Sequence, residues 1–250
     1  MNIVLVHGMP GFAAKFGIEY FNGVKHQLEK FPANVFVANL SFIGSIADRG
    51  EELRTQVSTA LSSGALNPDE KTHIIAHSQG GLDARYMLST PNVPPKIVSL
   101  TTIATPHQGS PIAELLDGPI LLSALDVLGI DRAALEDLTG RQMKKFNDTY
   151  ADNPKVDYFF AAGKGRGGQF ATSFPLLPLH RYIESLNGEA NDGLVTVSSA
   201  RHGKAISDPW LADHADEIGH DLDKPFDPKA VPPFDYLRAY EDIVKRVSSL

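Results

Sequence analysis

Residues 72–89 read THIIAHSQGGLDARYMLS, and this stretch decides the fold class. Its first part, residues 72–76, is apolar and β-branched and predicts a buried strand, whereas the part from Gly80 onward predicts a helix. The turn between them is so short that it strains the backbone of Ser78, and the residues two positions before and after it must be small. Ala76 and Gly80 meet this requirement. The stretch therefore predicts a strand, a sharp turn that exposes a serine hydroxyl, and a helix; the alternative is that Ser78 only caps the helix.

The rest of the chain continues the alternation of strands and helices. Short β-branched runs predict strands at residues 2–6, 35–39, 97–103, 156–161 and 203–207. Apolar side chains at helical spacing predict helices at residues 18–31, 45–62 and 233–250. This order implies right-handed crossovers, a mostly parallel central sheet with helices on both faces, and functional groups at the carboxyl ends of the strands. Because there are no internal repeats and no long linker, we expect residues 1–250 to form a single α/β domain.

Composition excludes several classes of function. The chain has no cysteine, which rules out disulfides, thiolate zinc sites and a cysteine nucleophile. Its net charge of −7, from 23 basic and 30 acidic residues, gives no reason to expect binding to nucleic acid or to an anionic membrane. No apolar run approaches the roughly 20 residues of an integral membrane segment. The chain starts on a predicted strand without a signal-peptide pattern, which favours a cytoplasmic location, with export by a non-classical route or a mature form as alternatives.

A second candidate element follows the first predicted strand, where residues 7–12 read HGMPGF. A serine that attacks a carbonyl needs two backbone N–H groups to bind the oxyanion that develops. One such group normally belongs to the residue after the serine, here Gln79, and the other to a loop after an early strand, here Met9. The alternative is a turn in which Gly8 and Gly11 serve only the backbone geometry.

The serine also needs a histidine as base and a carboxylate that orients it, which in this fold follow in the order serine, acid, histidine. Asp192 lies in an Asn-Asp-Gly turn that can present a carboxylate at the top of the sheet. His214 follows the last predicted strand in a loop, where the base is expected. The remaining alternatives are His202 and His220 for the base, and Glu189, Asp208 and Asp213 for the acid.

The segment 111–135 is unusually apolar and contains Gly118, Pro119 and Gly129 as candidate hinges. It predicts a lid that covers the site in water and makes transient contact with a lipid interface; an ordinary core helix is the alternative. Three apolar side chains are candidates for substrate binding, two from this segment and one from the run at 174–179: Leu121, Leu125 and Leu176. The glycine-rich residues 163–168 lack P-loop spacing and predict a surface loop.

Taken together, four motifs resemble the bacterial family I triacylglycerol lipases of the Pseudomonas type, over roughly residues 3–220. They are HGMPGF at 7–12, AHSQGG at 76–81, TIATPHQGS at 102–110 and NDGLV at 191–195. The resemblance implies an α/β-hydrolase fold, hydrolysis of carboxylic esters of long-chain lipids and a mobile lid. It also implies the site residues: Ser78, Asp192 and His214 as catalytic triad, with Met9 and Gln79 forming the oxyanion hole.

The family also holds a calcium ion near the catalytic histidine, and Asp216 matches one ligand of that site. However, no aspartate lies between Asp157 and Asp192, where the partner ligand belongs, and His220 stands where the family has an amide. A hard cation needs several oxygen ligands. We therefore expect no required cofactor, with calcium at Asp216 as the alternative.

The sequence as a whole predicts a serine hydrolase that acts on a lipid or small-molecule ester. A short-chain carboxylesterase is the alternative within the same chemistry, and a catalytically silent hydrolase fold that binds apolar ligands is the alternative outside it. The sequence leaves the oligomeric state open.

Overall fold

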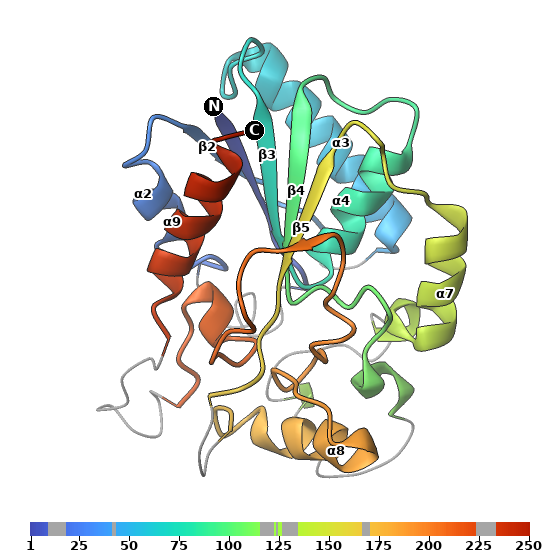
Figure 1. Cartoon of the computed structure of the whole chain (residues 1–250). Helices are drawn as coiled ribbons and strands as arrows, with labels where there is room; N and C mark the ends of the chain where they lie inside the picture. The colour runs from blue at the N-terminus through green and yellow to red at the C-terminus, as the bar shows by residue number, and fades with distance from the viewer. Residues whose placement is uncertain are drawn as a thin grey trace.

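A computed structural model of the chain describes residues 1–9, 19–41, 44–115, 123, 125–126, 135–166, 171–223 and 234–250 (Figure 1). Six parallel strands form one sheet in the order β2-β1-β3-β4-β5-β6. Their bounds are Asn2–Val6 (β1), Asn34–Val37 (β2), Thr72–His77 (β3), Ile97–Ile103 (β4), Asp157–Ala161 (β5) and Lys204–Ala205 (β6). The parallel sheet expected from the alternation of strands and helices is thereby confirmed.

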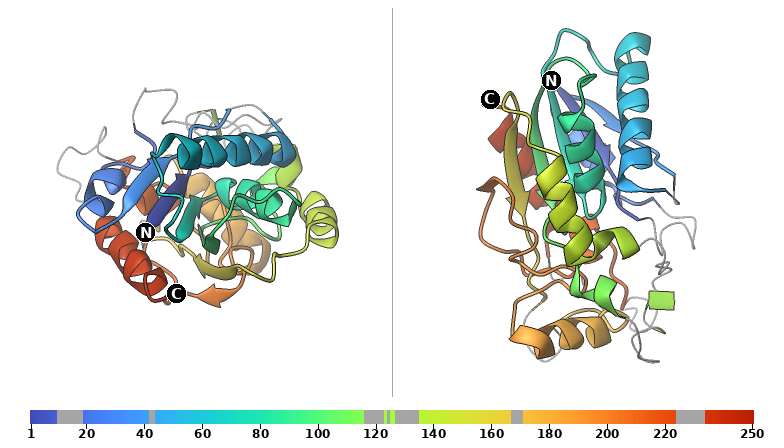
Figure 2. Two further views of the ribbon diagram at one scale, coloured as in Figure 1. Left: turned by 90° about the horizontal axis from the view of Figure 1, so that it is seen from above. Right: turned by 90° about the vertical axis from the view of Figure 1, so that its right-hand side faces the viewer.

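Helices cover both faces of this sheet, as Figures 1 and 2 show. Helices α2 (Val24–Leu28) and α9 (Tyr236–Val247) pack together on one face, and α3 (Ile46–Ser63) and α4 (Gly80–Ser89) pack together on the other. Because side chains alternate along a strand, β1 contributes Ile3 and Leu5 to the core under α2 and α9. Its Val4 and Val6 enter the core under α3 and α4.

Further helical segments follow the carboxyl ends of the strands; in Figure 1, α8 lies at the bottom and α7 at the right-hand side. They are α7 (Gly140–Thr149), α8 (Leu177–Asn187) and the 3₁₀ turns η1 (Pro111–Glu114), η2 (Glu136–Leu138) and η3 (Asp216–Ile218). The sequence did not predict α7 or α8, and the end of the run at 174–179 lies in α8. A third apolar cluster joins α7, α8, η1 and η2.

The predicted helix at 18–31 is shorter in the structure. Of its described part, only Val24–Leu28 is helical, and the residues before it form turns. Gly23 adopts a left-handed backbone with φ 67°, a conformation that an α-helix cannot contain, so the helix starts after it. Among the described helices, none is both long and apolar enough to cross a bilayer.

Glycine brings α4 against the end of β1. A Cβ atom on Gly80 would lie 2.6 Å from the Val6 carbonyl oxygen and 2.7 Å from that of His7. Only a residue without a side chain fits there. This close approach places the N-terminus of α4 and the residues that precede it beside the loop after β1.

Candidate active site

Ser78 lies on the turn between β3 and α4 with φ 55°, a left-handed conformation that residues other than glycine adopt at a cost. Backbone contacts on both sides hold it there. The Ser78 N–H donates to the Ile103 carbonyl at 2.9 Å, and the Thr105 hydroxyl donates to the Ser78 carbonyl at 2.7 Å. The strained turn expected from the sequence is therefore present, and the hydroxyl is fixed at the carboxyl end of β3.

His214 lies between Ser78 and Asp192, which come from segments far apart in the chain. Its Nε2 is 3.1 Å from the Ser78 Oγ, and its Nδ1 is 2.8 Å from the Asp192 Oδ2. The His214 N–H also donates to the Asp192 carbonyl at 3.0 Å. The structure thus brings together the three residues that sequence order selected.

Asp192 is fully buried, and its second oxygen is held by the turn that follows it. The Oδ1 atom accepts hydrogen bonds from the N–H groups of Leu194 at 2.8 Å and Val195 at 2.7 Å. These two donors fix the orientation of the carboxyl group. Asp192 therefore faces His214 with one oxygen, while the backbone holds the other.

The alternative bases and acids lie elsewhere. His202 bonds to Asp152 and stacks on His107, with ring centroids 4.5 Å apart. His220 bonds to the carbonyls of Glu19 and Tyr20. The rival acids bond to other groups or face solvent: Asp213 binds Ser173, Glu189 binds Ser198, and Asp208 is exposed.

The residues expected to bind an oxyanion lie on the two backbone segments that meet at the serine. Gln79 follows Ser78 and precedes the first turn of α4. A Cβ on Gly8 would lie 2.7 Å from the Ser78 Cβ and 3.1 Å from the Gln79 backbone nitrogen, so the loop that continues to Met9 passes directly against the serine turn. Met9 is half-buried.

A buried ion pair that the sequence analysis missed supports this loop. Arg49 of α3 pairs with Asp83 of α4 at 2.7 Å, and both side chains are almost fully buried. One Arg49 nitrogen also donates to the carbonyls of His7 at 2.9 Å and Gly8 at 3.2 Å. The pair thereby joins α3, α4 and the loop after β1.

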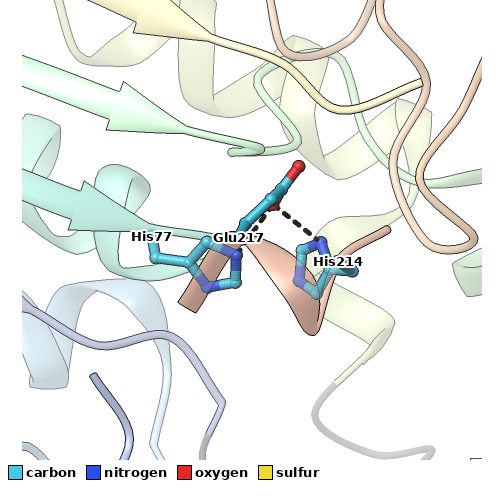
Figure 3. A group of neighbouring side chains, drawn as sticks. All are labelled: His77, His214 and Glu217. Atoms are coloured by element: carbon cyan, nitrogen blue, oxygen red, sulfur yellow. Dashed lines mark hydrogen bonds and ion pairs between the residues drawn. The ribbon is translucent and has the colours of Figure 1, made fainter. Parts of the chain in front are cut away.

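A second missed residue, Glu217, lies beside His214. Figure 3 shows its carboxyl group directed at two imidazoles: Glu217 Oε2 is 3.0 Å from His77 Nε2 and 3.8 Å from His214 Nδ1. The Tyr20 hydroxyl lies 2.8 Å from the other His77 nitrogen. Donor atoms of His77, His214 and Glu217 lie within 4.8 Å of one another, as metal ligands do. Both His214 nitrogens, however, already contact Ser78 and Asp192, so a metal would have to displace those contacts.

Burial shifts the pKa values of the groups in this cluster. Desolvation lowers the pKa of His77 well below its usual value, and the nearby His214 lowers it further. Desolvation, with the charge of Asp192 as the next cause, raises the pKa of Glu217 well above its usual value. Both shifts favour the uncharged forms of the two side chains, which lie in hydrogen-bonding contact at 3.0 Å.

The apolar cluster at this end of the sheet reaches the site. Ala215, next to His214, belongs to it, and Met9 and Leu194 pack against it. Leu125 and Leu176, two of the predicted substrate-binding residues, are buried in the same cluster. Leu121 and most of the predicted lid at 111–135 lie outside the described residues.

Asp216, the candidate calcium ligand, contacts an arginine. Its two oxygens accept hydrogen bonds from the Arg166 Nε at 2.8 Å and Nη2 at 2.6 Å. The loop at 163–168, predicted to lie on the surface, therefore contributes a largely buried side chain to the neighbourhood of His214.

Several known proteins are similar to this chain in sequence or in structure. Residues 2–164 match the family model described as palmitoyl protein thioesterase. A triacylglycerol lipase of Vibrio cholerae serotype O1 is 32% identical over 86% of this chain and 78% of its own length. A triacylglycerol lipase of Pseudomonas fragi is 29% identical over 87% of each chain. Among solved structures, the mature form of a Bacillus licheniformis lipase superposes with a TM-score of 0.71 at 27% identity, covering 90% of this chain and 89% of that one.

Proposed function

The chain belongs to the bacterial lipase family of α/β-hydrolases, and from this premise we propose that it is a triacylglycerol lipase of the Pseudomonas type that works through an acyl-enzyme on Ser78. The proposal is supported above all by one observation: the His214 imidazole lies 3.1 Å from the Ser78 hydroxyl and 2.8 Å from a buried carboxylate. A serine hydroxyl is a weak nucleophile until an adjacent base takes its proton. This geometry supplies both the base and the group that orients it.

In the proposed reaction, Ser78 Oγ attacks the ester carbonyl carbon while its proton passes to His214 Nε2. The negative charge moves to the carbonyl oxygen, which the backbone N–H groups of Gln79 and Met9 would bind. As the intermediate collapses, the bond to the alcohol oxygen breaks and His214 returns its proton to that oxygen. Asp192 stabilises the imidazolium that exists between the two transfers.

A water molecule then completes the cycle. His214 takes one proton from it, the hydroxyl attacks the acyl carbonyl carbon, and the bond to Ser78 Oγ breaks. The proton returns from His214 to Ser78 Oγ, and a carboxylic acid leaves. Each step uses the same three side chains, so atoms and charges balance without a further group.

The preference for long acyl chains is supported by the apolar cluster that reaches Ala215 and Met9, since a lipid chain needs an apolar surface next to the scissile bond. The predicted lid belongs to the same proposal. The match to the thioesterase family model favours a second candidate, hydrolysis of long-chain acyl thioesters. The same acyl-enzyme serves both, because only the leaving group differs.

The test compares substrates of graded chain length with one enzyme. We expect emulsified long-chain triacylglycerols to be hydrolysed and the rate to rise above the solubility limit of the substrate. Activity restricted to dissolved short-chain esters would identify a short-chain carboxylesterase, and faster release of thiol than of alcohol from matched palmitoyl substrates would favour the thioesterase.

The control is Ser78→Ala, which should lower turnover by about 10⁴-fold or more. Wild-type protein that binds these lipids and hydrolyses none of them would identify a non-catalytic binding protein.

A further inference from the structure

The loop that carries His214 is rich in carboxylates. Asp213 and Asp216 flank the histidine closely, and Asp221 and Asp223 follow in the same loop. The side chains of Asp213 and Asp216 are at most 1% exposed, and Asp221 is 4% exposed. Carboxylates this close together and this far from water repel one another unless a cation lies among them.

The guanidinium of Arg166 is that cation. Beyond its two hydrogen bonds to Asp216, its Nη1 lies 2.6 Å from Asp223, its Nη2 lies 3.4 Å from Asp221, and its Nε lies 3.6 Å from Asp213. Burial alone would lower the pKa of Arg166, but the hydrogen bonds to Asp216 and the charges of the other carboxylates raise it above its usual value. Arg166 carries its charge, as arginine side chains in proteins do.

The same carboxylates hold the backbone around His214. Asp213 Oδ1 accepts hydrogen bonds from the N–H groups of Ala215 and Asp216, both at 3.0 Å, and Asp216 Oδ2 accepts one from the Asp213 N–H at 3.0 Å. The histidine thus sits in a loop whose backbone is bonded to the side chains that Arg166 binds.

Two further contacts fasten this loop to the segment that precedes α8. Asp213 Oδ2 accepts from the Ser173 N–H at 2.7 Å and its hydroxyl at 2.6 Å, and Asp223 Oδ1 accepts from the Phe174 N–H at 2.6 Å. Arg166 comes from the loop after β5. The β5–α8 connection and the loop of His214 are therefore joined at two places, through the guanidinium of Arg166 and through Ser173 and Phe174, next to the proposed base.

We propose that Arg166 is a positioning residue for His214, and that its guanidinium does here what a bound divalent cation would do in an acidic loop. This inference rests on the proposed function for the role of His214. The carboxylates do not fit a calcium site in the folded chain, because a calcium ion needs six to eight oxygens around it and the guanidinium already occupies the space among them. A planar guanidinium also fixes carboxylates in direction, through paired hydrogen bonds.

The experiment measures turnover and thermal unfolding of wild type, Arg166→Ala, Arg166→Lys and the control Arg238→Ala. Arg238 forms an exposed pair with Asp242 on α9, so its removal should change neither quantity. For Arg166→Ala we expect kcat on a soluble nitrophenyl ester to fall about 10- to 100-fold, as when the groups that orient a site residue are removed, with little change in KM. Arg166→Lys keeps the positive charge but loses the paired N–H donors of the planar guanidinium. Its kcat should therefore lie between those of the alanine variant and wild type.

The measurement that decides between arginine and a metal ion repeats these assays with added cations. Wild type should show the same kcat and Tm with millimolar calcium, with a chelator, or with neither. In Arg166→Ala the four carboxylates remain, so calcium or low millimolar guanidinium should raise both kcat and Tm. Neither cation should restore Ser78→Ala, because that variant lacks the nucleophile.

Loss of activity and Tm by the chelated wild type would overturn the proposal, since a metal would then hold the loop. Wild-type kcat in Arg166→Ala would also overturn it. If Arg166→Ala does not fold in any buffer, Arg166→Lys decides through the same kcat and KM measurements: a wild-type kcat for that variant contradicts the proposal. If the wild type hydrolyses no ester, the proposed function fails. The Tm measurements with calcium and with a chelator then still show whether Arg166 or a metal ion holds the acidic loop.

Discussion

Ser78 adopts a strained backbone conformation, which lowers the stability of the folded protein. At φ 55° a side chain crowds its own backbone, at a cost of about 1–2 kcal/mol. The contacts from Ile103 and Thr105 hold the residue in place despite this cost. The strain is therefore located at Ser78, and relieving it should raise the free energy of unfolding.

Two variants without the hydroxyl isolate that strain. Ser78→Gly and Ser78→Ala should both be inactive, but Ser78→Gly should be more stable than Ser78→Ala by about 1 kcal/mol, because glycine adopts the left-handed region freely. Urea unfolding of the two variants measures the difference. Equal stability, or a more stable alanine variant, would show that the turn is not strained in solution.

Arg49 is the residue whose loss should most damage the loop after β1. Arg49→Met leaves Asp83 buried without its partner, which should lower the free energy of unfolding by about 3–5 kcal/mol. It also frees the carbonyls of His7 and Gly8, so kcat of the remaining folded protein should fall as well.

The control for Arg49→Met is Lys25→Met. Lys25 forms a pair with Glu29 at 3.7 Å on the surface of α2, and removing it should change stability by less than about 1 kcal/mol. Equal losses for the two variants in urea unfolding would contradict the role assigned to the buried pair.

The sequence predicted some site residues and missed others for a physical reason. Ser78, Asp192 and His214 could be predicted because each has a signal that is visible in the sequence. Ser78 lies in a turn of small residues, Asp192 lies in an Asn-Asp-Gly turn, and His214 follows both in the expected order. Arg49 and Glu217 lie in helical segments where charged residues ordinarily face solvent. Arg49 and Glu217 are buried only because segments distant in the chain pack against them, and no local sequence pattern indicates such packing.

Among the elements, α4 depends most directly on a single small residue. Gly80→Ala would place a Cβ 2.6 Å from the Val6 carbonyl oxygen, which belongs to the rigid backbone of β1. We expect the free energy of unfolding to fall by about 1–3 kcal/mol, as α4 shifts away from the sheet, and activity to fall with it.

Gly140→Ala at the start of α7 is the matched substitution. Its Cβ would meet the Gln108 carbonyl oxygen at an ordinary 3.7 Å, and alanine favours a helix over glycine. Stability should rise by up to about 1 kcal/mol in urea unfolding. A Gly80→Ala variant as stable as this one would mean that α4 does not approach β1 as closely as described.

The central elements were predictable, and the peripheral helices were not. The strand at 97–103 and the helix at 80–89 have the predicted bounds, because one is a buried β-branched run and the other follows a marked turn. Helix α8 begins at Leu177 and has Pro178 in its first turn, inside the apolar run at 174–179 from which the sequence predicts only the substrate-binding candidate Leu176. It is a helix because Leu179 and Ile183 pack into the apolar cluster, a tertiary contact that the run alone does not reveal.

The molecule as a whole buries several histidines in neutral form, which makes its stability depend on pH. Burial lowers the pKa of His7 and of His73 to about 4, from an ordinary value near 6.5. Below pH 6.5 the unfolded chain binds protons that the folded chain does not, so stability is complete above that pH and declines as the pH falls toward 4. Each such histidine should remove about 2 kcal/mol by roughly pH 5.

His73→Gln tests this dependence, because it removes one titrating group far from the proposed site. Urea unfolding at several pH values between 7.5 and 4.5 should show a shallower decline for the variant than for wild type, whatever its stability at neutral pH. Parallel curves would show that His73 titrates equally in the folded and unfolded chain.

The central claim is that Ser78, activated by His214, forms a covalent bond to the acyl group, and labelling with a serine-directed fluorophosphonate tests it most directly. Mass spectrometry of the labelled peptides should find one label per chain, on Ser78, in wild type and in His202→Ala at similar rates. Ser78→Ala should take up no label, and His214→Ala should react at least about 10³-fold more slowly than wild type. A label on another residue, or undiminished labelling of His214→Ala, would contradict the account.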